Sequence, residues 1–175
     1  MRMCTCILAS LFTLAVFVSG ASAQPITFMA QGTFDDGGTF SGIFNYEASS
    51  NIYNAINFVS TTGTTRTGAS YFFVCGAPDI PLCGDGFSPF PTSVAFQTTN
   101  AADQTGLPTL FMGFSVSLDQ ILFGETVPLR TGDHLSDEGT CNNTECTVDP
   151  NTRFTTAGTA ATESTPLFES LYFGS

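Results

Sequence analysis

Runs of alternating apolar and polar residues follow one another between residues 31 and 61. The first two runs meet at Asp35–Gly38, an Asp-Asp-Gly-Gly sequence. Asp-Gly and Gly-Gly pairs supply the positive φ that a tight hairpin turn requires. We therefore expect Phe34 and Thr39 to face each other across a turn that confines both glycines. This hairpin, with the third run behind it, predicts a β-meander.

Alternation also assigns one face of the meander to the core, because successive side chains of a strand point to opposite faces of the sheet. On the second run the predicted core face holds Phe40, Gly42, Phe44 and Tyr46. On the third run it holds Ile52, Asn54, Ile56, Phe58 and Ser60. A slip of one residue would turn these side chains to water, so the pattern specifies the register strongly.

The rest of the chain repeats this pattern of short strands separated by Gly, Pro, Asn and Asp. The further strands that the sequence predicts are Ile26–Phe34, Ala69–Cys75, Thr92–Thr99, Leu110–Leu118, Thr126–Arg130, Thr152–Thr162 and Leu167–Phe173. No window shows a sustained helical period. About 8–10 short strands predict an all-β fold, an antiparallel β-sandwich with a jelly-roll-like or open-barrel arrangement as its variants.

The first 23 residues have the layout of a secretory signal peptide. Arg2 gives a positive start, Cys4–Val18 is an apolar run, and Ala21–Ala23 is a small-x-small cleavage site. The alternative is a transmembrane anchor, but the apolar run is shorter than the ~20 residues that span a bilayer. We therefore expect residues 24–175 to form a single secreted domain, extracellular or periplasmic, with no membrane insertion after cleavage.

Charge excludes two classes of partner. Beyond residue 23 the chain has no lysine and only three arginines, Arg66, Arg130 and Arg153, against fifteen carboxylates. Nucleic acids and anionic membranes are bound by clustered Lys and Arg, which this chain does not supply. The acidity is typical of a soluble protein, or of one that holds divalent cations.

Four cysteines remain beyond the signal peptide: Cys75, Cys83, Cys141 and Cys146. An even number in an exported chain indicates disulfides. Of the three possible pairings we favour Cys75–Cys83 with Cys141–Cys146, because each pair brackets a short loop that closes at little entropic cost. A zinc site is the competing interpretation, but the spacings differ from those of a zinc ribbon.

The chain has one histidine, His134, beside Asp133 and Asp137. These residues would suit a hydrolase of polysaccharides or esters if a serine nucleophile lay nearby, but no G-x-S-x-G elbow is present to expose one. A solvated loop histidine is the simpler interpretation. The sequence therefore favours a protein that is not an enzyme, and it identifies no catalytic residue.

Calcium is the one cofactor that the acidic loops suggest. Asp35 and Asp36, Asp79 and Asp85, and the set Asp133, Asp137 and Glu138 offer hard oxygen ligands on loops. None follows the spacing of an EF-hand, and Asp is also common at turns for purely conformational reasons. The loop with Asp133, Asp137 and Glu138 is the first candidate for a metal site, which would suit a calcium-dependent carbohydrate-binding module.

The run Asp36–Glu47, DGGTFSGIFNYE, and the strand Tyr53–Thr62 behind it resemble the opening of bacterial secreted proteins of the PEP-CTERM, or exosortase-sorted, type. The sequence departs from that group at its end, where no Pro-Glu-Pro motif and no terminal arginine cluster occur. The resemblance implies an exported β-sandwich and no catalytic residue. With the composition, it favours a secreted, non-enzymatic structural, matrix or adhesion-type protein, whose partners would be extracellular polysaccharide or cell-surface matrix.

We predict that the exported protein begins at Gln24, because cleavage follows the small residues at Ala21 and Ala23. N-terminal sequencing of the protein from a culture supernatant measures this directly. Protein that keeps Met1 and sediments with the membranes would contradict both the cleavage and the localisation.

Overall fold

The computed structural model describes residues 24–75, 89–101, 103, 105–132, 135–142 and 152–163. The strands are β1 (Ile26–Phe34), β2 (Thr39–Glu47), β3 (Ile52–Ser60), β4 (Ser70–Tyr71), β5 (Phe73–Val74), β6 (Ser93–Gln97), β7 (Pro108–Gly113), β8 (Thr126–Pro128), β9 (Asp137–Thr140) and β10 (Arg153–Thr162). One 3-10 turn, η2 (Leu118–Gln120), follows β7. The all-β prediction is confirmed. Of the described residues, no helix is both long and apolar enough to cross a membrane.

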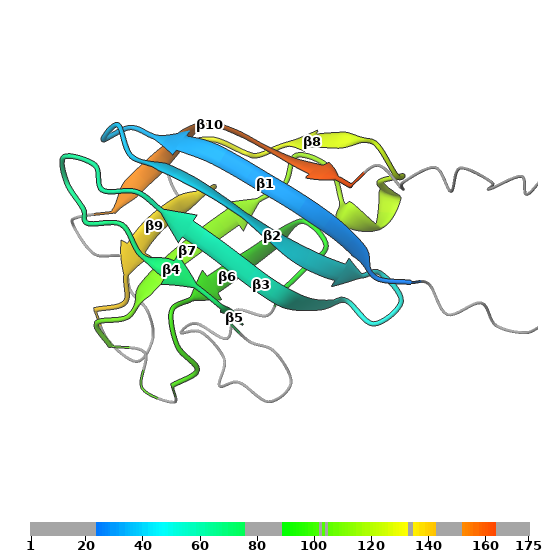
Figure 1. Ribbon diagram of the computed structural model, residues 1–175, viewed down its shortest axis with the longest axis horizontal. Helices are drawn as coiled ribbons and strands as arrows, with labels where there is room; N and C mark the ends of the chain where they lie inside the picture. The colour runs from blue at the N-terminus through cyan, green and yellow to red at the C-terminus, as the bar shows by residue number, and fades with distance from the viewer. Residues whose placement is uncertain are drawn as a thin grey trace, which may run out of the picture.

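The strands form one antiparallel sheet in the order β4-β3-β2-β1-β10-β9-β7-β6-β5, with β8 also paired to β10. The sheet curls until its ends meet, because the two end strands are consecutive pieces of one segment. Ser70 and Tyr71 pair with β3, and Phe73 and Val74 then pair with β6. Figure 1 shows the long strands β1, β2 and β3 crossing over β6, β7 and β9. The arrangement is a nearly closed barrel, the open-barrel variant of the predicted fold.

Aromatic side chains fill the space between these two layers. The ring of Phe44 on β2 lies 5.2 Å from that of Phe28 on β1, and 5.8 and 6.0 Å from those of Phe96 and Phe114 on the opposite layer. Phe40, Phe44 and Tyr46 are all buried, so the predicted core face of β2 is confirmed. The interior is therefore packed with rings at its centre.

The hairpin between β1 and β2 differs by one residue from the prediction. Thr33 pairs with Thr39, and the amide of Phe34 donates to the carbonyl of Gly38 at 2.8 Å. Phe34 thus faces Gly38 rather than Thr39. Gly37 alone adopts positive φ, at 84°, because the turn needs a single left-handed residue to bring the chain back into register.

The core face of β3 was predicted correctly at one end of the strand and wrongly at the other. Ile56, Phe58 and Ser60 are buried as expected, but Ile52 is 37% exposed and Tyr53 takes its place in the core. The cause is a bulge, since the pairing with β2 shifts between Ile43 and Asn45. Ala55 sits there with φ at 52°, and the additional residue reverses the alternation before it.

We predict that Phe44→Asp abolishes cooperative folding, whereas Val59→Asp on the same sheet does not. Phe44 is fully buried, but Val59 is 49% exposed on the outer face. Burying a carboxylate without a partner costs several kcal/mol, and losing the ring removes about 1.5–3 kcal/mol more, against a typical total stability of about 5–15 kcal/mol. Urea unfolding followed by circular dichroism measures both variants. A soluble Phe44→Asp protein that unfolds cooperatively would show that the core assignment is wrong.

Candidate functional site

The predicted calcium ligands do not lie together as far as the structure describes them. Asp137 and Glu138 are neighbours on β9, so they point to opposite faces of the sheet: Glu138 is fully buried and Asp137 is half-buried. Asp133 and His134 lie outside the described residues, as do Asp79 and Asp85. The calcium site therefore stays a prediction. Of its predicted ligands, Glu138 already has ionic and hydrogen-bonding partners within the protein.

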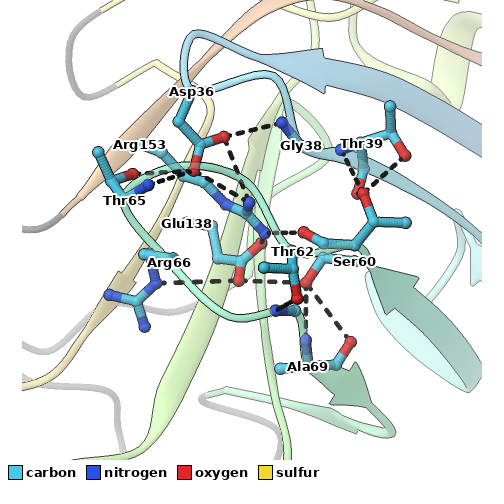
Figure 2. A network of polar contacts seen from close by, with 12 residues as sticks. Asp36, Gly38, Thr39, Ser60, Thr62, Thr65, Arg66, Ala69, Glu138 and Arg153 are labelled. Atoms are coloured by element: carbon cyan, nitrogen blue, oxygen red, sulfur yellow. Dashed lines mark hydrogen bonds and ion pairs between the residues drawn. The ribbon is translucent and has the colours of Figure 1, made fainter.

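Glu138 belongs instead to a buried ionic cluster at one end of the barrel. Arg153 on β10 lies at its centre, with its side chain fully buried (Figure 2). One terminal nitrogen, Nη2, donates to Glu138 Oε2 at 2.9 Å, and the other, Nη1, lies 3.3 Å from both oxygens of Asp36. The guanidinium also stacks over the ring of Phe34, 4.1 Å from its centroid. Arg153 therefore joins the β1–β2 turn to β9.

The loop between β3 and β4 completes the cluster (Figure 2). Arg66 lies with its Nε 3.9 Å from Glu138 Oε1, and the hydroxyl of Ser60 donates to the same oxygen at 3.1 Å. On the other carboxylate, the hydroxyl of Thr65 donates to Asp36 Oδ2 at 2.8 Å. The cluster thus balances two carboxylates with two guanidinium groups, which is how buried charges are tolerated.

Two glycines make room for these charged groups. A Cβ on Gly38 would collide with Nη1 of Arg153, and a Cβ on Gly63 would collide with the carboxylate of Asp36. The sequence predicted that turn geometry confines Gly38 as well as Gly37, but the φ of Gly38 is not positive. The closeness of Arg153 explains this residue better than the turn does.

The surroundings of Asp36 stabilise its ionised form. Burial alone raises the pKa of Asp36, but hydrogen bonds from Gly38 and Thr65 and the charge of Arg153 outweigh it and lower the pKa from 3.8 to about 2. Since the folded-state pKa lies below the ordinary value, this ionisation stabilises the fold fully above pH 3.8 and the contribution is lost as the pH falls towards about 2. Burial, and then the charge of Glu138, raise the pKa of the Tyr71 hydroxyl, which keeps that group neutral.

This arrangement suits a structural clamp better than acid–base chemistry. Both oxygens of Glu138 accept hydrogen bonds, one from Arg153 and one from Ser60, and Asp36 accepts several more. A general base must offer a free lone pair to its substrate. The cluster instead ties together four segments that are distant in sequence: the β1–β2 turn, the loop after β3, and the strands β9 and β10.

Cys75 and Cys141 are fully buried at the ends of β5 and β9, and both are disulfide-bonded. Their predicted partners, Cys83 and Cys146, lie outside the described residues. The pairing Cys75–Cys83 with Cys141–Cys146 therefore stays a prediction.

Sequence reasoning missed this cluster because it considered the three arginines only as charges too scattered to bind nucleic acid or anionic membranes. The signal that could have found Arg153 is its position in an alternating strand, between Thr152 and Phe154 and in phase with Thr155, which is buried. β9 was missed as well, since Asp137–Thr140 has a polar sequence that no strand pattern identifies.

No protein-family model, curated protein or solved structure matches this chain. Among the described residues, no group of three or more His, Cys, Asp or Glu side chains is placed to hold a metal ion.

We predict that Arg153→Met destabilises the protein by about 3–5 kcal/mol, because it leaves two buried carboxylates short of a counter-charge. Arg130→Met is the matched control: Arg130 is exposed, and its replacement should change the free energy of unfolding by less than about 0.5 kcal/mol. Urea unfolding at neutral pH gives both values.

A double variant tests whether the loss of stability comes from the buried charges of the cluster or from a general effect on packing. Adding Glu138→Gln to Arg153→Met removes one of the stranded charges, so the double variant should lose less stability than the two single losses added together. Strict additivity, or an Arg153→Met protein as stable as Arg130→Met, would show that the cluster does not act as a unit.

Proposed function

We propose that this chain is an exported, non-enzymatic structural, matrix or adhesion-type module that makes its contacts through the outer face of β1, β2, β3 and β10. The clamp at one end and the aromatic core hold this four-stranded face in one shape. Because the interior is filled by side chains such as Phe44, Phe58 and Phe96, the outer surface is the part of the barrel that can meet a partner.

The observation that carries the proposal is the absence of charge from the central rows of this face, in a chain that is otherwise strongly acidic. Glu47, at the end of β2, lies at the margin of the face. The pairing of the strands places its outward residues in three rows across the sheet. The rows are Ala161, Met29, Ile43 and Asn57; then Thr159, Gln31, Ser41 and Val59; then Ala157, Thr33 and Thr39. We call these residues the uncharged face. It holds neither a charged nor an aromatic side chain.

The exposed carboxylates of the described residues lie elsewhere, at turns and strand ends. They are Asp35, Asp103, Asp119, Glu125 and Glu163. A net charge far from zero keeps molecules in solution and apart. A broad surface that lacks such charge, with hydroxyl, amide and a few apolar groups, is suited to contact with an uncharged partner such as a neutral matrix.

The described residues do not supply the groups on which the two other functions suggested by the sequence, a hydrolase and a calcium-dependent carbohydrate-binding module, would depend. Asp36 and Glu138 are bound to arginines, and Asp133 and His134 lie outside the described residues. The uncharged face is the better-supported site of contact.

The test compares two double variants that each add two negative charges. Gln31→Glu with Ser41→Glu places them on the uncharged face, and Ser115→Glu with Gln120→Glu places them on exposed residues between β7 and the end of η2. Labelled protein is applied to beads of neutral polysaccharide, acidic polysaccharide and an apolar polymer, and the retained fraction is measured.

We expect wild type and the Ser115→Glu/Gln120→Glu control to be retained on a neutral or apolar surface. Gln31→Glu/Ser41→Glu should bind at least about tenfold more weakly, since an unpaired charge in a contact easily costs the 1.4 kcal/mol that corresponds to that factor. Equal retention of the two variants would overturn the assignment of the contact surface.

A further inference from the structure

We propose that Gln24 is a modification site, at which the exported chain closes its own N-terminus into a pyroglutamate ring. The proposal goes beyond the contact function above. It depends on the predicted cleavage after Ala23, which makes Gln24 the first residue of the mature chain. The closed ring replaces the positively charged terminal amine with a neutral amide.

Gln24 lies where this reaction is unhindered. Gln24 and Pro25 are exposed and precede Ile26, the first residue of β1. No hydrogen bond between the described residues involves the side chain of Gln24. The carboxamide is therefore able to turn back towards the α-amine that cleavage creates. Both groups belong to one residue, so they meet as an intramolecular pair, and the product is an unstrained five-membered lactam.

The chemistry is an acyl transfer within this residue. The α-amine attacks Cδ of the carboxamide, a bond forms between the amine nitrogen and Cδ, and the bond between Cδ and Nε2 breaks. Nε2 takes up the proton that the amine gives up and leaves as ammonia, which lowers the mass of the chain by about 17 Da. No oxidant, metal or second substrate takes part. An α-amino group ordinarily has a pKa of about 7.7–8.0, so about a tenth of it is in the reactive neutral form at pH 7.

The composition of the chain gives this modification a specific consequence. The sequence contains no lysine, so after cleavage the α-amine of Gln24 is the only amine. The three arginines do not replace it, because their guanidinium groups stay protonated at neutral pH. Cyclisation therefore removes the one group of the mature chain at which amine-directed crosslinking, acylation or glycation begins.

The closed terminus also protects a central strand. Only Pro25 separates Gln24 from β1, which pairs with β2 from Ile26 onward and with β10 from Phe28 onward. Proteolysis concentrates at chain termini, and an aminopeptidase requires a free α-amine. Trimming past Pro25 would reach the first pair of β1, Ile26 with Tyr46. A ring at Gln24 removes the group that such an enzyme must bind.

Mass spectrometry and amine labelling of the protein from a culture supernatant test the proposal. After denaturation and digestion with chymotrypsin, the N-terminal peptide, residues 24–28, should be lighter by about 17 Da than the linear peptide. A succinimidyl ester, which reacts with amines, should label almost none of the intact chains. Any linear remainder should lose its ability to be labelled during incubation at neutral pH.

Gln24→Glu is the matched control, because an ionised carboxylate is a far poorer acyl group than a carboxamide. This variant should keep its amine and take up one label per chain. It should also lose its first two residues to aminopeptidases that include one able to cleave before Pro25, whereas wild type keeps them. Circular dichroism checks that both proteins have the same fold.

The outcomes distinguish the modification from the predictions on which it depends. Wild type that begins at Gln24 and still takes up one label per chain after incubation would overturn the cyclisation and leave the cleavage intact. Protein that begins at any other residue would contradict the cleavage and the modification together. Retention on beads is measured independently, so the contact function is tested separately from both.

Discussion

The shape of this molecule depends on one buried guanidinium group. Arg153 meets Asp36 on one side and Glu138 on the other, and it packs on the ring of Phe34. These partners come from the first hairpin and from the strand before β10, so a single side chain fixes how the two layers of the barrel meet. Burying such a charge is costly, and only the full set of partners compensates for that cost. The clamp therefore specifies one arrangement of the strands more than it adds stability.

Much of the fold could be predicted because local pattern and tertiary burial agree. The alternation of Phe40, Phe44 and Tyr46 identifies the core face of β2, since a sheet buried on one side imposes a period of two. The pattern fails at Ala55, where one additional residue at positive φ reverses the faces. Nothing in the local sequence distinguishes a bulge from continued alternation there, because Ile52 is as apolar as Tyr53.

The candidate site was far less accessible to sequence reasoning. Glu138 was considered as a ligand for calcium because it offers a hard oxygen on the same predicted loop as Asp133 and Asp137, yet its partner is an arginine fifteen positions away on the next strand. Asp36 meets Arg153 across 117 positions. Such pairings depend on which strands become neighbours, and that information is distributed over the whole chain. The uncharged face has the same origin, since it exists only once β10 lies beside β1.

The segment Ser70–Val74 has a consequence for how this barrel resists misassembly. It pairs with Phe58 and Val59 of β3 along one part and with Phe96 and Gln97 of β6 along the next, so part of the edge of each strand is covered. Exposed sheet edges are templates on which other chains add strands, and they are the usual starting point of fibrils. Here the two edges are protected by a few residues of one segment. If Ser70–Val74 detached, both edges would be uncovered at once. This segment is therefore the weak point through which copies could exchange strands.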